Sequence, residues 1–197
     1  AAELKIGAIL PLSGYIAAVG QGQKVAMNMA LEEINAKGGV NGMKLKIVII
    51  DDAGKAEESI NAAKRLINRD KVLMIWGPFT SGQCENTFPV ANRSGTPIVS
   101  SSSAKPGVAA KNRPWAFRNS VTTDKRYRDI VKLWVDRFKI KRVVVLYDNQ
   151  EQVMKATALR VFPPLLKAAG AQVVDTITHG TKDVDHSAQV TRLKSLK

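Results

Sequence analysis

VLMIWGPFTSG, residues 72–82, is the stretch that decides the fold. Its apolar run, residues 72–76, is typical of a strand buried in a parallel sheet. Gly77 and Pro78 break the run, so Thr80 and Ser81 stand where the next helix would begin. Hydroxyl groups at the carboxyl end of a strand and at a helix N-terminus are suited to hold a small anion. Serine and threonine are also ordinary helix N-caps, so both interpretations stay open here.

The same arrangement recurs one unit later in the chain. An apolar run, residues 97–99, leads directly into four serines, residues 100–103. Because the carboxyl ends of parallel strands meet at one edge of a sheet, the two hydroxyl-rich segments are expected to lie close together. The repetition predicts one polar pocket, with Phe79, Thr80 and Ser81 on one wall and Ser102 and Ser103 on the other.

Alternating strands and helices surround these two segments. Strands are expected at residues 5–10, 45–50, 72–76 and 97–100, and helices at residues 20–37, around 60–67 and 82–93. The first helix carries apolar residues at helical spacing and ends at Gly38-Gly39, followed by an Asn41-Gly42 turn. Apolar strands separated by amphipathic helices indicate an α/β fold with a parallel, doubly wound sheet covered on both faces.

The alternation lapses between residues 100 and 122 and then resumes. A short extended crossing is expected at residues 117–121. Four apolar residues of the next helix are expected to face inward: Ile130, Leu133, Trp134 and Phe138. Strands follow at 143–147 and 173–177, a helix over 151–170 is broken by Pro163-Pro164, and a last helix begins at Ser187. This pattern predicts one domain over residues 1–119 and a second, shorter one over residues 120–197.

The composition fits a soluble globular protein, with 45% hydrophobic and 24% charged residues among 197. No apolar run approaches the roughly 20 residues that span a bilayer. The net charge of +13 is concentrated after residue 104, where it is +11. The aromatic residues there are not interleaved as stacking platforms for bases, so we expect a basic solvated surface and no nucleic-acid partner.

Catalytic and metal-binding motifs find little support. No Gly-x-Ser-x-Gly elbow surrounds any serine, and Gly20-Gln21-Gly22 lacks the third glycine of a dinucleotide loop. Asp183-x-Asp185-His186 fits a polar loop better than a metal site, and Asp51-Asp52 fits a turn. Cys84 is the single cysteine and is expected to be a buried thiol. We therefore expect no enzymatic activity, no metal and no cofactor.

Five groups of residues together match a known pattern along the whole chain. They are Lys5–Gly7 with Pro11–Gly14, Ala30 with Ile34–Gly42, Lys46–Val48 with Asp51-Asp52, Gly77-Pro78 with Ser81-Gly82, and Pro97–Ser100. In these residues the sequence resembles the type I solute-binding proteins of ABC transporters, of the branched-chain amino-acid class. The stretch over residues 34–42 with its following strand is the most specific part of the resemblance.

The resemblance implies a two-lobed clamshell that closes on a small carboxylate, delivers it to a membrane permease and catalyses nothing. It implies that Ser81 and the loop of Ser102 and Ser103 hold the ligand carboxylate. Val19 and Gln152 align with further positions of the family's binding site, and Tyr15 is expected to line the cleft. It also implies a protein of roughly twice this length, so the second lobe is expected to be incomplete.

Three positions depart from the amino-acid-binding pattern of the family. Ala104 stands where a threonine is usual, Val19 where a tyrosine often precedes the glycine that matches Gly20, and Gln152-Val153 where a Tyr-Gly pair is common. These changes leave two ligand classes open, an α-amino acid or an aromatic or other organic acid without an amine.

The resemblance and Ala1-Ala2-Glu3, which fits the residue left after signal-peptide cleavage, together predict a periplasmic protein. Its contact with the membrane is expected only through the permease. Two other classes are kept: a ligand-sensing domain of a receptor or transcription regulator of the same fold, and an α/β enzyme.

Overall fold

The computed structural model describes residues 3–196 in two compact units. The first unit comprises residues 1–103 and 107–120, and the second comprises residues 104–106 and 121–197. The division falls between Ser120 and Val121, one residue after the expected boundary. Residues 104–106, which were expected in the first domain, belong to the second unit. That these units are ligand-binding lobes stays a prediction. The expected signal-peptide remnant at Ala1-Ala2 lies outside the described residues.

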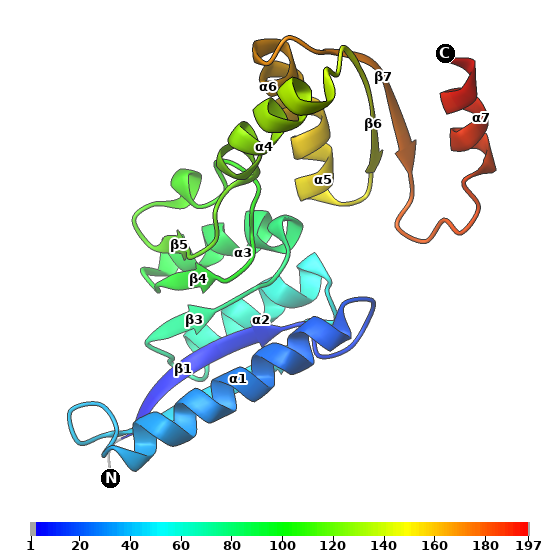
Figure 1. Cartoon of the computed structure of the whole chain (residues 1–197). Coiled ribbons are helices and arrows are strands. Elements are labelled where there is room, and N and C mark those ends of the chain that lie inside the picture. The colour runs from blue at the N-terminus through cyan, green and yellow to red at the C-terminus, as the bar shows by residue number, and fades with distance from the viewer. Residues whose placement is uncertain (1–2, 197) are drawn as a thin grey trace. The chain divides into compact units, whose positions relative to one another are not determined.

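The first unit is a five-stranded sheet with helices on both faces (Figure 1). Its strands are β1 (Glu3–Leu10), β2 (Lys44–Asp51), β3 (Met74–Trp76), β4 (Ile98–Ser100) and β5 (Ala116–Arg118). Its helices are α1 (Ala17–Ala36), α2 (Ala56–Asn68), α3 (Ser81–Ser94) and the 3-10 helix η1 (Ala110–Asn112). All neighbouring strands are parallel, in the order β2-β1-β3-β4-β5, which confirms the expected doubly wound α/β fold.

The main core lies on one face of this sheet. Side chains of α2 and α3, among them Leu66 and Phe88, pack on Ile9, Ile75 and Ile98, and all five are fully buried. Alternate strand residues point to the opposite face, where α1 lies over β1 and β2. The expected Gly38-Gly39 end of α1 is confirmed, since both glycines have positive φ and the Gly39 N–H donates to the Ile34 carbonyl oxygen at 2.9 Å.

The second unit is built on two parallel strands, β6 (Arg142–Asp148) and β7 (Gln172–His179). Its helices are α4 (Thr123–Phe138), α5 (Gln152–Ala156), α6 (Phe162–Ala168) and α7 (Ser187–Ser195), with a π-helical turn, η2 (Thr157–Val161), before α6. The expected break at Pro163-Pro164 is confirmed, because both prolines lie at the start of α6. A proline is tolerated there because the first N–H groups of a helix have no carbonyl partner within it.

The prediction for α4 is wrong. Four residues expected to face inward, Ile130, Leu133, Trp134 and Phe138, are 36%, 59%, 53% and 66% exposed. Val131 and Val135 are buried instead, against Leu166 of α6 and Ala171. Both sets repeat at helical spacing, so periodicity alone does not choose between them. Packing against α6 chooses the valine stripe, which also includes the half-buried Tyr127.

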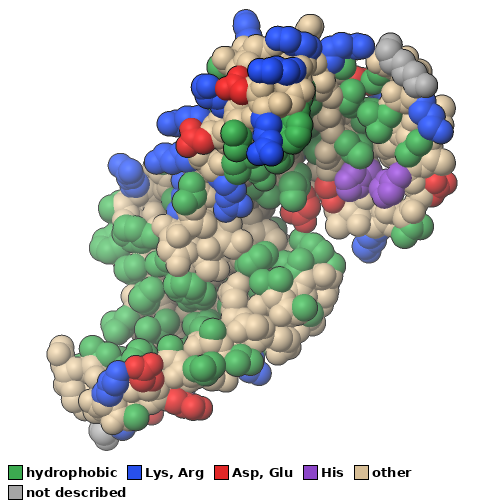
Figure 2. Space-filling view, in the orientation of Figure 1, with side chains coloured by type: hydrophobic (Ala, Val, Ile, Leu, Met, Phe, Trp, Pro, Cys, Tyr) green, Lys and Arg blue, Asp and Glu red, His purple; other side chains and the backbone are tan. Residues whose placement is uncertain are grey.

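No helix among residues 3–196 is both long and apolar enough to cross a membrane. Basic side chains gather on the second unit, where Figure 2 shows Lys and Arg in blue. Most of α4 is exposed, and its Lys132 pairs with Asp136 at 2.8 Å. The basic side chains expected after residue 104 are therefore exposed on this unit, and the expected lack of a nucleic-acid partner stays a prediction.

Candidate functional site

The sheet order of the first unit places a crevice at the ends of β1 and β3. These two strands are neighbours, but the chain leaves β1 for β2 on one side and continues from β3 to β4 on the other. In open parallel sheets, ligands bind outside the carboxyl ends of the strands at such a reversal. The loops at this edge are residues 11–16, 77–80 and, one strand further, 101–103. The sequence placed hydroxyl groups on the last two loops but did not give the strand order.

Thr80 caps α3 in the way its spacing to Gln83 predicts. The Thr80 Oγ1 accepts from the Gln83 N–H at 3.2 Å, and the Gln83 Oε1 accepts from the Thr80 N–H at 2.9 Å. This reciprocal pair is a capping box. The structure therefore gives Thr80 a structural contact, while its hydroxyl keeps a proton to donate.

Ser81 and Ser103 meet at the same edge. The Ser103 Oγ donates to the Ser81 Oγ at 3.2 Å, and the two residues are only 1% and 2% exposed. Ser100 links the two loops: its Oγ donates to the Pro78 carbonyl oxygen at 2.8 Å and accepts a hydrogen bond from the Ser103 N–H at 3.1 Å. The two hydroxyl-rich segments expected to form one pocket are therefore joined side chain to side chain.

The other predicted site residues lie in three places. Phe79 and Ser102 are half-buried beside the joined loops. Tyr15 and Val19 are 56% and 41% exposed, on the loop after β1 and in the first turn of α1. Gln152 is the exposed first residue of α5, in the second unit. The first unit thus gathers Phe79, Thr80, Ser81, Ser102 and Ser103, and ligand contact by all eight residues stays a prediction.

Two carboxylates at the end of β2, Asp51 and Asp52, take part in this edge of the sheet, although the sequence pattern predicted only a turn there. Asp51 accepts from the Leu12 N–H at 2.8 Å, the Ser13 Oγ at 2.6 Å and the Ala53 N–H at 2.8 Å. Burial raises the pKa of Asp51, but these hydrogen bonds lower it by more. Asp51 therefore ties the loop after β1 to the loop after β2.

Asp52 is fully buried, and burial raises its pKa, to which the neighbouring charge of Asp51 adds. Its carboxylate accepts hydrogen bonds from Gly54, Ser59 and Gln83, which oppose the rise. This carboxylate does not reach solvent. Asp52 can therefore affect the candidate site only through the side chains that it contacts.

The described residues hold no cluster of His, Cys, Asp or Glu suited to a metal ion. His179 and His186 lie edge to face, with ring centroids 5.3 Å apart. Cys84 is buried, as expected, and donates to the Pro78 carbonyl oxygen at 3.4 Å. Burial raises the pKa of its thiol to about 12, which keeps it protonated at neutral pH.

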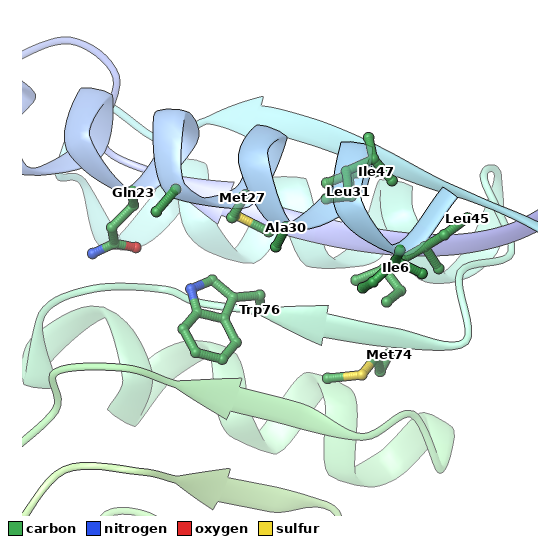
Figure 3. Close-up of a pocket in the computed structure, with 11 residues that line it drawn as sticks. Ile6, Gln23, Met27, Ala30, Leu31, Leu45, Ile47, Met74 and Trp76 are labelled. Atoms are coloured by element: carbon green, nitrogen blue, oxygen red, sulfur yellow. The ribbon is translucent and has the colours of Figure 1, made fainter. Parts of the chain in front are cut away.

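A separate pocket of about 380 Å³ lies between α1 and the sheet (Figure 3). Its walls are almost entirely apolar and include Met27, Leu31, Met74 and Trp76, with Gln23 at one end. Trp76 is thus half-buried in this pocket and belongs neither to the main core nor to the loops of the candidate site. A lining without charge or hydroxyl groups is unsuited to a carboxylate.

Comparison with known proteins identifies the family. The model of the periplasmic binding proteins matches residues 3–197. The chain belongs to this family. This periplasmic binding protein is 32% identical over 198 residues to the Leu/Ile/Val-binding protein BraC3 of Rhizobium johnstonii, an alignment that covers 100% of the chain and 53% of the relative. It spans about half the length of the curated relatives it matches.

Solved structures show the same fold. The branched-chain amino acid substrate-binding protein LivJ of Streptococcus pneumoniae, in complex with isoleucine, superimposes with a TM-score of 0.86 at 25% identity. That alignment covers 98% of the periplasmic binding protein described here and 54% of LivJ. A Rhodopseudomonas palustris solute-binding protein in complex with 4-hydroxybenzoate gives 0.84 at 22% identity, with 98% and 51% covered, and shows the fold alone. The expected type I, branched-chain amino-acid family is confirmed.

Proposed function

We propose that this periplasmic binding protein serves an ABC transporter by capturing a small carboxylate between two lobes and delivering it to a membrane permease. The ligand is an amino acid or an aromatic or other organic acid. The protein acts outside the cytoplasm and catalyses no reaction. The observation that carries the proposal is the meeting of Ser81 and Ser103 at the edge of the sheet where the strand order reverses.

The chemistry of this edge suits a carboxylate. Hydroxyl groups donate to carboxylate oxygens, and such charge-assisted bonds are stronger than neutral ones. Ser81 is also the first residue of α3, whose N-terminus favours negative charge. Relatives support the same class, since several of them are named as Leu/Ile/Val-binding proteins.

In this proposal the remaining predicted residues complete the pocket around the carboxylate. Phe79, Thr80 and Ser102 line the wall beside it, and Tyr15 and Val19 contact the rest of the ligand from the β1 side. Gln152 approaches from the second lobe as the protein closes. Closure excludes water from the ligand, and the bound ligand thereby stabilises the closed form that the permease recognises.

The test measures binding by the full-length protein. Isothermal calorimetry with leucine and with 4-hydroxybenzoate, each beside its primary amide, separates the two ligand classes and shows whether a carboxylate is required. Ser81→Ala and Ser103→Ala are each expected to weaken carboxylate binding about tenfold or more, the effect of losing one hydrogen bond to a charged group.

Ser94→Ala is the matched control, because Ser94 lies at the other end of α3 and its hydroxyl donates to the Ala91 carbonyl oxygen. It is expected to leave binding unchanged. Full affinity in both Ser81→Ala and Ser103→Ala, or equal affinity for acid and amide, would contradict the proposal. Mass spectrometry of small molecules released from the purified protein then identifies the natural ligand.

A further inference from the structure

Three polar side chains form a closed group directly behind the candidate site. Asp52, Ser59 and Gln83, the buried triad, are at most 1% exposed. The Gln83 Nε2 donates to the Asp52 Oδ2 at 2.6 Å and to the Ser59 Oγ at 2.9 Å, and the Ser59 Oγ donates to the same carboxylate oxygen at 2.9 Å. The Gly54 N–H donates to the other oxygen at 3.0 Å. The triad therefore links the loop after β2, helix α2 and helix α3.

The carboxylate decides which way the Gln83 amide points. An amide group has a donor end and an acceptor end of nearly equal shape, whereas the two Asp52 oxygens here accept from Gly54, Ser59 and Gln83. With its NH₂ end held by Asp52, the Gln83 carbonyl oxygen faces the Thr80 N–H, which it accepts at 2.9 Å. Asp52, which lies 31 positions away from Gln83 in the chain, thus fixes the orientation of the amide in the capping box at the start of α3.

Burial makes this setting rigid. A glutamine that caps a helix at the surface can exchange between several side-chain rotamers, because nothing but the cap holds it. Gln83 instead gives up that freedom, because both ends of its amide are bonded. Buried polar groups are stable only when they are paired in this way.

We infer that Asp52 is a positioning residue for ligand binding: through Gln83 it fixes Thr80 and the first turn of α3, and with them the Ser81 hydroxyl. The inference rests on the proposed function in naming a carboxylate as the ligand. Its structural half, that Asp52 holds the start of α3, is independent of any ligand. Asp52 itself does not touch the ligand.

The test compares four variants of the full-length protein. Asp52→Leu and Gln83→Leu each remove one side of the contact, whereas Asp52→Asn keeps an oxygen that accepts from the Gln83 amide. Leu66→Ala is the matched control, because Leu66 is a fully buried core residue of α2 with no part in the triad. Its loss of core packing lowers stability without altering the capping box.

Two readouts are measured on each variant. Amide hydrogen exchange over residues 80–84 is expected to accelerate in Asp52→Leu and Gln83→Leu, but not in Leu66→Ala, and to stay near wild type in Asp52→Asn. Affinity for leucine and 4-hydroxybenzoate is expected to fall about tenfold or more in the two leucine variants, the loss of one charge-assisted hydrogen bond. The preference for each acid over its primary amide is expected to fall with it.

Each outcome decides between the two ideas. Unchanged exchange over residues 80–84 in both leucine variants overturns the inference, whatever the protein binds. Faster exchange with full carboxylate affinity also overturns it. If exchange is faster in the two leucine variants but the wild-type protein binds neither acid, the structural half is supported and the two tested acids are excluded as ligands. An equal loss of affinity in Leu66→Ala overturns the inference by showing that general stability explains the effect.

Discussion

In the first unit, Phe88, Ile75 and Ile98 are completely buried between the sheet and two helices, whereas no apolar side chain reaches zero exposure among the described residues of the second unit. The second unit's core is a small cluster around Leu166, Val131 and Val135, which keep 4–6% exposure. The first unit also contains the buried triad and the joined serines. Most of the predicted ligand contacts therefore lie in the first unit, which is the better packed of the two. Rigid packing around a binding site keeps its side chains in the geometry that binding requires.

The largest expected effect concerns the thiol in the first unit. Cys84 is fully buried and its pKa is raised to about 12 by burial, so a thiolate forms only after the unit opens. We expect modification by a maleimide at neutral pH to be at least about a thousandfold slower than in the denaturant-unfolded chain, which corresponds to an opening free energy near the usual stability of a domain. Rates within tenfold of each other would show that this core is not closed.

Core truncation compares the two units directly. Phe88→Ala is expected to destabilise the first unit by about 3–5 kcal/mol, and Leu166→Ala the second by about 2 kcal/mol, because a smaller and partly exposed cluster loses fewer contacts. Denaturant unfolding followed by amide exchange of each unit measures both. Equal acceleration of exchange in both units by either change would contradict independent cores.

Backbone geometry gives a smaller effect within the first unit. Gly77 has φ +102°, and a Cβ there would lie 2.1 Å from the Ile9 carbonyl oxygen, so Gly77→Ala is expected to destabilise by more than about 1 kcal/mol. Gly22 in α1 has open space around it, and Gly22→Ala is expected to stabilise by about 0.5–1 kcal/mol. Thermal unfolding distinguishes the two signs. A neutral Gly77→Ala would show that the loop relaxes without strain.

The smallest expected effect is local to α7 in the second unit. No residue of α7 is buried, and Arg192 holds the helix through two 2.6 Å bonds to Asp175 of β7. Arg192→Lys loses the bidentate geometry, so exchange over residues 187–195 is expected to rise while β7 stays protected. Lys194→Ala on the same helix is the control. Unchanged exchange in Arg192→Lys would mean that other contacts hold α7.

The predictions that rested on local sequence patterns were the most accurate. The strands β1 to β4, the capping box of Thr80 and Gln83, the glycine end of α1 and the break before the two prolines all depend on neighbours within a few residues. In contrast, β5 was expected only as a short extended crossing over residues 117–121. The meeting of the two hydroxyl-rich segments was also expected, because parallel strands bring their ends together. The hydrogen bond between Ser81 and Ser103 came from the structure alone. The features predicted from local patterns follow from chemistry that a short window of sequence contains.

Contacts between residues far apart in the chain could not be predicted from the sequence. In α4, two apolar stripes have the same period, and only contact with α6 selects Val131 and Val135 over Trp134 and Phe138. The position of Trp76 in the pocket beside α1 depends on the strand order, which no periodicity reveals. The triad of Asp52, Ser59 and Gln83 joins residues up to 31 positions apart, and each of them alone looks like an ordinary turn or cap.

The apolar pocket between α1 and the sheet also affects the choice of assay for identifying the ligand. Environment-sensitive dyes fluoresce when they enter apolar surroundings, and a space of about 380 Å³ walled by Met27, Leu31 and Trp76 offers them such surroundings in the folded protein. A dye-based melt would then start from a bright baseline, and a compound that merely displaced the dye would imitate a true ligand. Calorimetry uses no dye and so avoids that false positive, whereas the fluorescence of Trp76 would itself respond to a compound in this pocket.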